Sequence, residues 1–286
     1  MLKYICVVNG EKYDGYEDFC HRAGKRGIRV VKLAEADNWI DAVLTGEHTE
    51  DKELAGKTMN DIKNDSLLIT DTDMDGIHDM IVGLGEHYSG NAPFVMTDFD
   101  ISMNYIQLIY DRYHNKPHTI AVTDRLVIRE MTVEDLPEMY QLYDSLSHCP
   151  YVEPLYEYDR ELEFTENYIR NMYGFFQYGL WLVYERNTGK LIGRAGLEHR
   201  EIDGRTRQEL GYIIHREFQG KGYGYEACRA VLEYAEQELG LGEIFVCTDI
   251  NNNPSRNLAL KLGFESYATD VDGFDIYHIY LKLPQQ

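Results

Sequence analysis

The segment from Glu209 to Leu239 constrains the fold more than any other part of the chain. It reads as an apolar strand at Leu210–Ile214, a glycine-rich turn at Gln219–Gly224, and a helix that continues to Leu239. Within the helix, apolar residues recur at steps of three and four, so one side of it would face a sheet. Such a strand–turn–helix unit indicates an α/β fold.

The glycine-rich turn has the composition of an anion-binding site. Gly220, Gly222 and Gly224 would let the backbone approach a phosphate closely, and free N–H groups of the helix would point at it. The spacing differs from the G-x-x-x-x-G-K-[ST] phosphate loop and from the G-x-G-x-x-G dinucleotide motif. Taken alone, the turn is equally consistent with a flexible connection before a helix.

Four patches in the second half of the chain resemble the GNAT superfamily of N-acetyltransferases, in order and in spacing. Gln219–Gly224 resembles the cofactor motif [RQ]-x-x-G-x-[GA], and Leu126–Arg129 with Asp135 resembles the opening L-x-I-R…D stretch. Asn253–Ser255 and Lys261–Phe264 resemble the N-x-S…K-x-G-F stretch of the branch that includes ribosomal-protein alanine and serine acetyltransferases. The resemblance covers about residues 125–283 and implies a mixed, mostly antiparallel central sheet flanked by helices.

The resemblance also implies acetyl-CoA as co-substrate and assigns its contacts by matching position, without a metal ion. Backbone groups of Tyr212, Ile213 and Ile214 would pair with the pantetheine arm as an added strand does. The residues that would hold the pyrophosphate, at the positive end of the following helix, are Gln219, Gly220, Lys221, Gly222, Tyr223 and Gly224. Those expected to contact the arm or the nucleotide are Asn253, Ser255 and Arg256. For Lys221, a solvated loop lysine is the competing interpretation.

An amine that attacks a thioester must be neutral, so its proton needs an acceptor. A carboxylate suits that role when burial raises its pKa toward neutrality. Glu209 starts the strand that leads to the glycine turn, where the family frequently keeps such a base, and we predict it as the base. Glu198 and Glu153 are second choices, and an exposed acid at a strand start is the alternative for Glu209. A backbone N–H near Ile213 or Ile214 would stabilise the thioester oxygen.

One position departs from the family pattern. Many superfamily members have a tyrosine five residues before the phenylalanine of the G-F pair, where it protonates the departing thiolate, but this chain has Ala259. Tyr212, Tyr267 or another tyrosine would substitute, or the thiolate would leave unassisted, since an ordinary thiol pKa of about 8.5 permits that.

The acceptor pocket is expected in the stretch from Tyr140 to Tyr178, where tyrosines and phenylalanines alternate with glutamates and a helix is predicted over Arg160–Tyr173. Aromatic rings combined with carboxylates suit a cation. They suit the packing face of a helix equally well.

The sequence of the first half of the chain predicts a small α/β layer domain with some parallel strand pairing. We place this domain at residues 1–115, ahead of the acetyltransferase domain at 125–286. A helix pattern ends near Tyr113 and Pro117 follows, which marks the boundary. The strand-like runs are Tyr4–Val8, Ile28–Leu33, Ser66–Thr70 and Phe94–Thr97. The helix-like runs are Tyr16–Ala23, Ala36–Leu44, Ile77–Glu86 and Ile101–Tyr113.

A second motif follows the run Ser66–Thr70, where aspartates alternate from Asp71 and Gly76 follows. The spacing begins like a calcium loop, but its twelfth position is Val82, where a bidentate glutamate should stand. A strand that ends in D-x-D also resembles the nucleophile loop of haloacid-dehalogenase-type phosphatases, with Asp71 as nucleophile and Asp73 as acid. The remainder of that family's residues is not recognisable, and a plain turn is the alternative.

The net charge is −21, and both halves contribute similarly. Such a field repels phosphate backbones and anionic lipids, so neither nucleic acid nor a membrane is expected as a partner. Five scattered cysteines and the lack of a leader or an 18-residue apolar run predict a cytoplasmic protein. The whole pattern predicts a two-domain N-acetyltransferase that acts on a small-molecule or peptide amine, with its oligomeric state open. The alternatives are a non-catalytic acyl-CoA sensor and phosphatase-like activity in the first domain.

Overall fold

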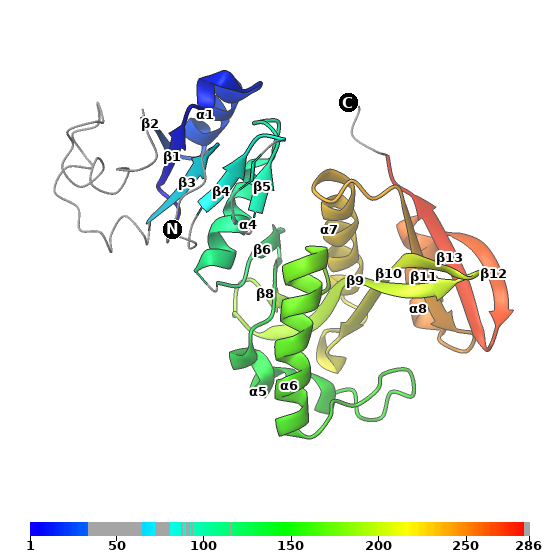
Figure 1. Ribbon diagram of the computed structural model, residues 1–286. Helices are drawn as coiled ribbons and strands as arrows, with labels where there is room; N and C mark the ends of the chain where they lie inside the picture. Colours follow the sequence, from blue (N-terminus) through cyan, green and yellow to red (C-terminus); the bar gives the residue numbers. More distant parts are fainter. Residues whose placement is uncertain are drawn as a thin grey trace. The chain divides into compact units, whose positions relative to one another are not determined.

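The computed structural model describes residues 1–33, 65–71, 81–86, 88–89, 92, 94–114 and 116–282. The chain forms two compact units, Met1–Lys116 and Pro117–Gln286. Each unit has its own sheet and its own hydrophobic core (Figure 1). Among the described residues, no helix is both long enough and apolar enough to cross a bilayer.

Unit 1 is built on a five-stranded sheet in the order β2-β1-β3-β4-β5, and every neighbouring pair is parallel. Its strands are β1 (Tyr4–Val8), β2 (Arg29–Leu33), β3 (Ser66–Thr70), β4 (Ile81–Leu84) and β5 (Phe94–Met96). Helices α1 (Tyr16–Lys25) and α4 (Met103–Tyr113) pack their apolar sides into its core, where Phe19 and Ile106 are fully buried. The expected α/β layer class is confirmed, and the pairing is more fully parallel than expected.

The helix expected over Ile77–Glu86 is wrong, because Ile81–Leu84 forms strand β4 in the sheet of unit 1. All four residues of β4 are buried, so both faces of the strand are covered. A buried parallel strand reads as a continuous apolar run and carries no period that distinguishes it from a helix. The helix expected over Ala36–Leu44 lies outside the described residues.

Unit 2 has an eight-stranded sheet in the order β12-β13-β11-β10-β9-β8-β7-β6. Its strands are β6 (Thr119–Val122), β7 (Leu126–Arg129), β8 (Leu180–Glu185), β9 (Leu191–Ile202), β10 (Arg205–Ile214), β11 (Glu243–Asp249), β12 (Glu265–Val271) and β13 (Phe274–Tyr280). Only β10 and β11 pair in parallel, which confirms the mixed, mostly antiparallel sheet. Strand β6 lies in the stretch that the sequence suggested as a connection.

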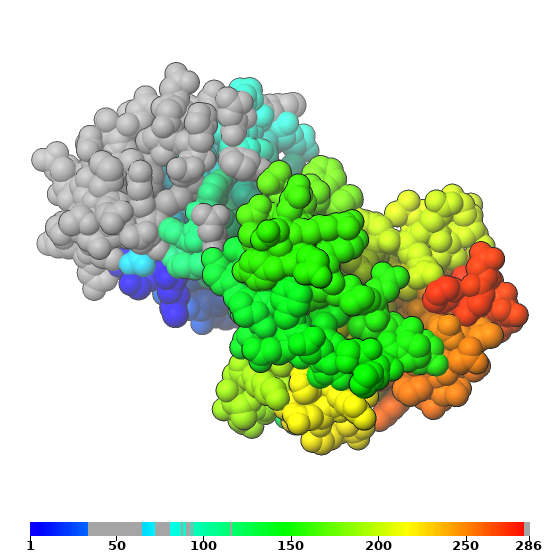
Figure 2. Space-filling view, turned by 90° about the horizontal axis from the view of Figure 1, so that it is seen from below, coloured from blue at the N-terminus to red at the C-terminus, as the bar shows by residue number. Residues whose placement is uncertain are grey.

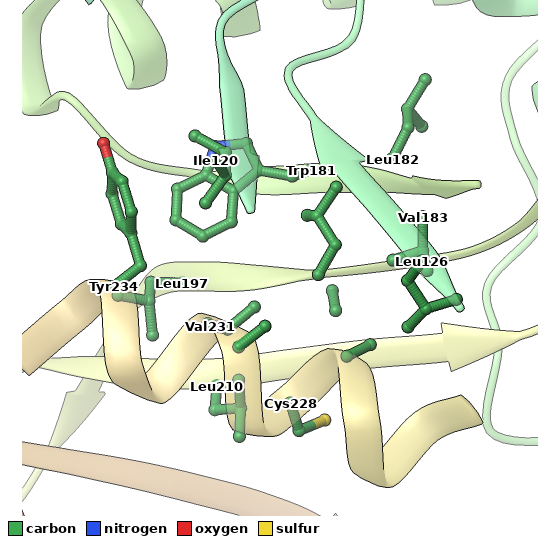
Figure 3. Close-up of a cluster of buried hydrophobic side chains, with 14 of the residues drawn as sticks. Ile120, Leu126, Trp181, Leu182, Val183, Leu197, Leu210, Cys228, Val231 and Tyr234 are labelled. Carbon is green, nitrogen blue, oxygen red and sulfur yellow. The ribbon is translucent and has the colours of Figure 1, made fainter. Parts of the chain in front are cut away.

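Helix α7 (Tyr223–Gln237) packs on one face of this sheet. Figure 3 shows Leu197 and Leu210 from the sheet against Val231 from the helix, and all three are nearly inaccessible to solvent. Trp181 and Tyr234 meet there edge to face, with 5.3 Å between ring centroids. The apolar spacing that predicted this helix therefore marks its buried side.

The remaining helices of unit 2 are α5 (Leu136–Asp144), α6 (Tyr158–Tyr168), the π-helix η3 (Ile169–Phe176), α8 (Asn253–Leu262) and the short 3-10 helices η2 (Val133–Asp135) and η4 (Arg216–Phe218). The predicted helix at Arg160–Tyr173 changes from α to π geometry at Ile169. Since side chains alternate along a strand, Glu198 and Glu209 point to the face opposite Leu197 and Leu210. That face, opposite α7, carries the candidate acid–base residues.

Candidate active site and ligand pocket

Strands β10 and β11 diverge, and the gap between them is the central feature of the site. Their only register pair is Glu209 with Phe245, whereas β10 remains paired with β9 as far as Ile214. The N–H of His215 bonds to Ile192 on the β9 side, so the alternation of an antiparallel ladder turns the backbone groups of Tyr212 and Ile214 toward the gap. The Ile214 carbonyl accepts from Nε2 of Gln219 at 2.8 Å, so the groups available to an extended ligand are the N–H of Ile214 and the backbone of Tyr212.

A pocket of about 540 Å³ opens at this gap. Its walls come from the end of β10, the glycine turn, the first turns of α7 and α8, and the stretch after α5. The lining residues are Leu146, Cys149, Tyr151, Val152, Tyr212, Ile213, Ile214, Phe218, Gln219, Gly220, Gly222, Gly224, Tyr225, Asn252, Pro254, Ser255, Asn257, Leu258 and Lys261. Eight of the residues predicted from the sequence thus surround one cavity.

The glycine turn has a conformation that explains its composition. Gly220 and Gly222 adopt positive φ values of 72° and 84°, which side chains disfavour. Gly222 is the N-cap of α7, and no side chain caps the helix. The first N–H groups of α7 therefore remain available to an anion, which the helix dipole also favours.

Arg125 holds this turn from outside the motif. Its guanidinium donates to the carbonyl of Lys221 at 3.0 Å and stacks 4.3 Å from the ring centroid of Tyr223. Glu226 anchors the guanidinium at 2.6 Å, and Thr123 donates to the same carboxylate at 2.6 Å. Burial raises the pKa of Glu226, but the bonds from Thr123 and Arg125 outweigh burial and lower it overall. The ion pair therefore persists at neutral pH.

Several predicted residues lie beside the pocket without lining it. Lys221 is exposed, with its ammonium 5.5 Å from the ring centroid of Phe218, and Tyr223 stacks on Arg125. Arg256 pairs with Asp275 at 3.1 Å. Asn253 is exposed at the first residue of α8.

Asn252, which the sequence interpretation passed over, lines the pocket in place of Asn253. It is the N-cap of α8, and its side chain accepts from the N–H of Ser255 at 3.3 Å. An asparagine followed by a proline at the second helical position is a readable cap signal, so this residue could have been found. Tyr225 and Lys261 were also missed, and the Lys261 ammonium lies 4.8 Å from the ring centroid of Tyr225.

Tyr212 joins the two sides of the gap. Its hydroxyl lies 2.7 Å from Oγ of Ser255 and donates to the Ser255 carbonyl at 3.1 Å. Burial raises the pKa of Tyr212 well above its usual range, so the hydroxyl stays protonated. Tyr267, the other named tyrosine, bonds to Asp203 and is absent from the pocket wall. Ala259 is fully buried in the core.

Glu209 sits at the apex of the gap, where β10 meets β11. Burial raises the pKa of its carboxyl group, which is the direction a general base requires. Two interactions oppose that rise, an ion pair with Arg200 at 3.3 Å and a bond from the N–H of Cys247 at 3.2 Å. The carboxyl is therefore oriented from two sides. Glu153, a second choice, is exposed on the loop before α6.

Glu198 stands directly opposite Glu209 in the β9–β10 register, so the two carboxyl groups are cross-strand neighbours on one face. Tyr168 donates to Glu198 at 3.3 Å and accepts from the N–H of Leu180 at 2.7 Å. Burial raises the pKa of Tyr168 well above its usual range, so it acts only as a neutral hydroxyl. Gly211, beside the pair, has no side chain to close this face.

In unit 1, Asp71 follows β3 at the carboxyl end of the sheet. The strand order reverses between β1 and β3, and Asn9, just after β1, donates to Asp71 at 3.1 Å. Ligands of parallel α/β sheets bind at such positions. Asp73, the proposed partner acid, lies outside the described residues, and Val82 is buried in β4.

The comparisons with known proteins concern the second half of the chain. The model of the acetyltransferase (GNAT) domain matches residues 125–265. The uncharacterized protein YkkB of Bacillus subtilis is 31% identical over 149 residues, which are 51% of this chain and 84% of that protein. The uncharacterized N-acetyltransferase YoaA of the same organism is 27% identical over 148 residues, with 51% and 82% covered. A ribosomal-protein-S5-alanine acetyltransferase structure from Vibrio fischeri superposes with a TM-score of 0.46 at 17% identity, over 56% of this chain and 95% of that one.

Proposed function

Since this chain belongs to the GNAT acetyltransferase family, we propose that unit 2 transfers the acetyl group of acetyl-CoA to a primary amine held in the same complex. The observation that supports this most is the pocket between β10 and β11, which runs from exposed backbone groups to the glycine turn before α7. An extended arm that ends in phosphates has the shape and charge that this pocket accommodates.

The residues present fit acetyl-CoA. The backbone of Tyr212 and the N–H of Ile214 suit the amides of the pantetheine arm, and the uncapped start of α7 suits the pyrophosphate. Lys261 adds a positive charge at the pocket wall. When bound, acetyl-CoA supplies an acetyl group as a thioester. The chain's own contribution is to hold that ligand in the gap and to accept the proton of the amine.

Glu209 is the residue we propose as proton acceptor. Its buried position raises its pKa, and its contacts with Arg200 and Cys247 fix its direction. Tyr212, protonated and set in the pocket wall, is the hydroxyl we propose near the leaving thiolate.

Arg200→Met should move the acidic limb of the pH–rate profile to higher pH. Arg200 lowers the pKa of Glu209 against the effect of burial, so its removal raises that pKa further. The base works only when deprotonated, and activity would then be lost at a higher pH as the solution is acidified. The measurement is kcat against pH with saturating amine and acetyl-CoA.

Arg207→Met is the matched control. Arg207 lies on β10 directly opposite Arg200 on β9, and it also forms an ion pair, but with Glu243 at 3.1 Å. This variant changes the net charge equally and should leave the acidic limb in place. Identical profiles for the Arg200 variant and the unaltered protein would rule out the Arg200–Glu209 coupling.

The amine-transfer proposal is tested by thiol release from acetyl-CoA with a panel of small amines and peptides. Amine-dependent release is expected, because the base and the pocket lie within one unit. Tight acetyl-CoA binding with no release above hydrolysis, for any amine, would instead favour the non-catalytic acyl-CoA sensor. Mass spectrometry of the products would identify the acetylated nitrogen.

We further propose a cytoplasmic location and two separate domains, at residues 1–115 and 125–286. The five cysteines are scattered along the chain and odd in number, which suits a reducing compartment. The net charge of −21 disfavours nucleic acid and anionic membranes as partners. Separate sheets and cores in the two units support the division.

A further inference from the structure

We propose that the outer side of α6 is a docking surface for a cationic peptide segment, whose N-terminal amine is the acetyl acceptor. The inference rests on the proposed acetyl transfer and adds the class of acceptor. The supporting observation is a row of aromatic side chains that starts on the exposed surface and ends at Glu198, which lies opposite the proposed base Glu209.

The row of aromatic side chains consists of Tyr156, Phe164 and Tyr168. The ring centroids are 5.9 Å apart between the first two and 6.0 Å apart between the last two. Tyr156 and Phe164 are exposed at 43% and 47%, whereas Tyr168 is half-buried and donates to Glu198. A ligand that follows these rings from the surface is led to the carboxyl pair.

The outer side of α6 is exposed, and hydrogen bonds hold the backbone of Tyr156 in place. Figure 2 shows the green region of the chain, which includes α6, as a broad open face of unit 2. The buried carboxyl of Glu161 accepts from the N–H of Tyr156 at 3.0 Å, and Tyr140 donates to the Tyr156 carbonyl at 2.7 Å. Few side chains would have to be ordered on binding, which lowers the entropic cost.

The charge of the surface selects the partner. Along α6, four acidic residues accompany a single basic residue, Arg160. Glu161 is buried, and the exposed carboxylates on α6 and at its N-cap are Glu157, Asp159, Glu163 and Glu166. Aromatic faces and carboxylates together favour lysine and arginine side chains and repel acidic ones.

One guanidinium already occupies this row of rings. The Arg160 guanidinium lies 3.9 Å from the ring centroid of Tyr156, close enough for a cation–π contact. Phe164 carries no such cation among the described contacts, although it is equally exposed and is bordered by Glu163. A guanidinium from a partner would bind Phe164 as Arg160 binds Tyr156.

The length of the row of rings favours a peptide over a small amine. From Arg160 to Tyr168 the helix rises about 12 Å, at roughly 1.5 Å per residue. An extended chain covers that distance with about four residues. A peptide with its amine at the Glu198–Glu209 pair would therefore present roughly its third to fifth side chains to Phe164 and Tyr156.

The test compares two peptides that differ only in charge. One carries arginine at positions three to five and the other glutamate, and neither contains lysine, so the N-terminal amine is the single acceptor. Thiol release should give a KM for the arginine peptide at least about tenfold lower, rising with salt. Calorimetry with the same peptides, in the presence of CoA, measures docking without turnover.

Phe164→Ala should raise KM for the arginine peptide by roughly three- to tenfold and leave kcat, and KM for a small amine, unchanged. Phe175→Ala removes an even more exposed ring, 78% accessible, from outside the row and is the matched control. Glu163→Gln with Glu166→Gln tests the charge without altering any ring, and should weaken the arginine peptide alone.

The docking surface is wrong if both peptides bind equally, or if the Phe164 and Phe175 variants behave alike. It is also wrong if a small amine is acetylated with a far lower KM than the arginine peptide, or if α6 variants change only self-association. A third outcome would separate the two proposals. If the unaltered protein released no thiol but still bound the arginine peptide selectively, and Phe164→Ala lost that binding, the proposed transfer would be rejected and the docking surface supported.

Discussion

Gly220→Asp is expected to raise the Kd of acetyl-CoA by roughly 100-fold or more. The aspartate would place a fixed negative charge at the turn where the proposed pyrophosphate meets the start of α7, and like charges about 4 Å apart repel strongly near a protein surface. No atom lies within 4 Å of a Cβ built on Gly220, so the side chain has room. Calorimetry with CoA measures the loss directly.

The matched control is Gly204→Asp, in the turn between β9 and β10. Gly204 has a φ of 67°, against 72° for Gly220, and also has no atom within 4 Å of its Cβ position. The two variants therefore share the backbone strain and the added charge, and differ only in location. An unchanged Kd for the Gly220 variant, with both proteins folded, would reject the turn as the phosphate site.

Glu209→Gln is expected to lower kcat by about 100- to 10,000-fold, which is the usual contribution of a general base. The amide keeps the shape of the side chain and can still contact the Cys247 backbone and Arg200 region. The Kd of acetyl-CoA should not change, because Glu209 is absent from the pocket wall. The pH–rate profile should also lose its acidic limb, since burial raises the pKa of this carboxyl and protonation at low pH stops the base.

Glu198→Gln serves as the comparison, because the two carboxyl groups face each other across β9 and β10. We expect a change mainly in KM for the amine, as Glu198 ends the row of aromatic side chains and is bonded to Tyr168. If instead kcat were lost in the Glu198 variant and retained in the Glu209 variant, we would conclude that Glu198 is the base.

The sequence was most informative where local pattern and local function coincide. The strand β10, the glycine turn and α7 are adjacent in the chain, so their periodicity and composition predicted both the elements and the anion site. Eight of the residues predicted to bind the cofactor line one pocket. Local signals failed at β4, because a strand buried on both faces has no alternation. At α8 the cap signal of Asn252 was readable, but the interpretation assigned the cofactor contact to Asn253 instead.

Contacts between distant segments could not be predicted from one sequence. Arg125 donates to the carbonyl of Lys221, which lies 96 positions further along the chain. The amino-acid sequence of neither segment alone predicts that bond. The pairing of Glu198 with Glu209 depends on the β9–β10 register, since a slip of one residue would move one of them to the opposite face. The row of rings on α6 needs the same long-range information to connect it with Glu198.

The single register pair between β10 and β11 has a thermodynamic consequence. β9 and β10 share ten register pairs, so the backbone ladder is well paired from β6 to β10 and again from β11 to β13, and it is weakest between β10 and β11. This seam in the ladder is where partial opening of the sheet should cost least. A ligand that bonds to both sides binds only the closed form, so it stabilises the closed sheet by an amount that grows with the logarithm of its concentration above Kd. In this unit, bound acetyl-CoA would add backbone hydrogen bonds at the place where the sheet's own ladder has fewest.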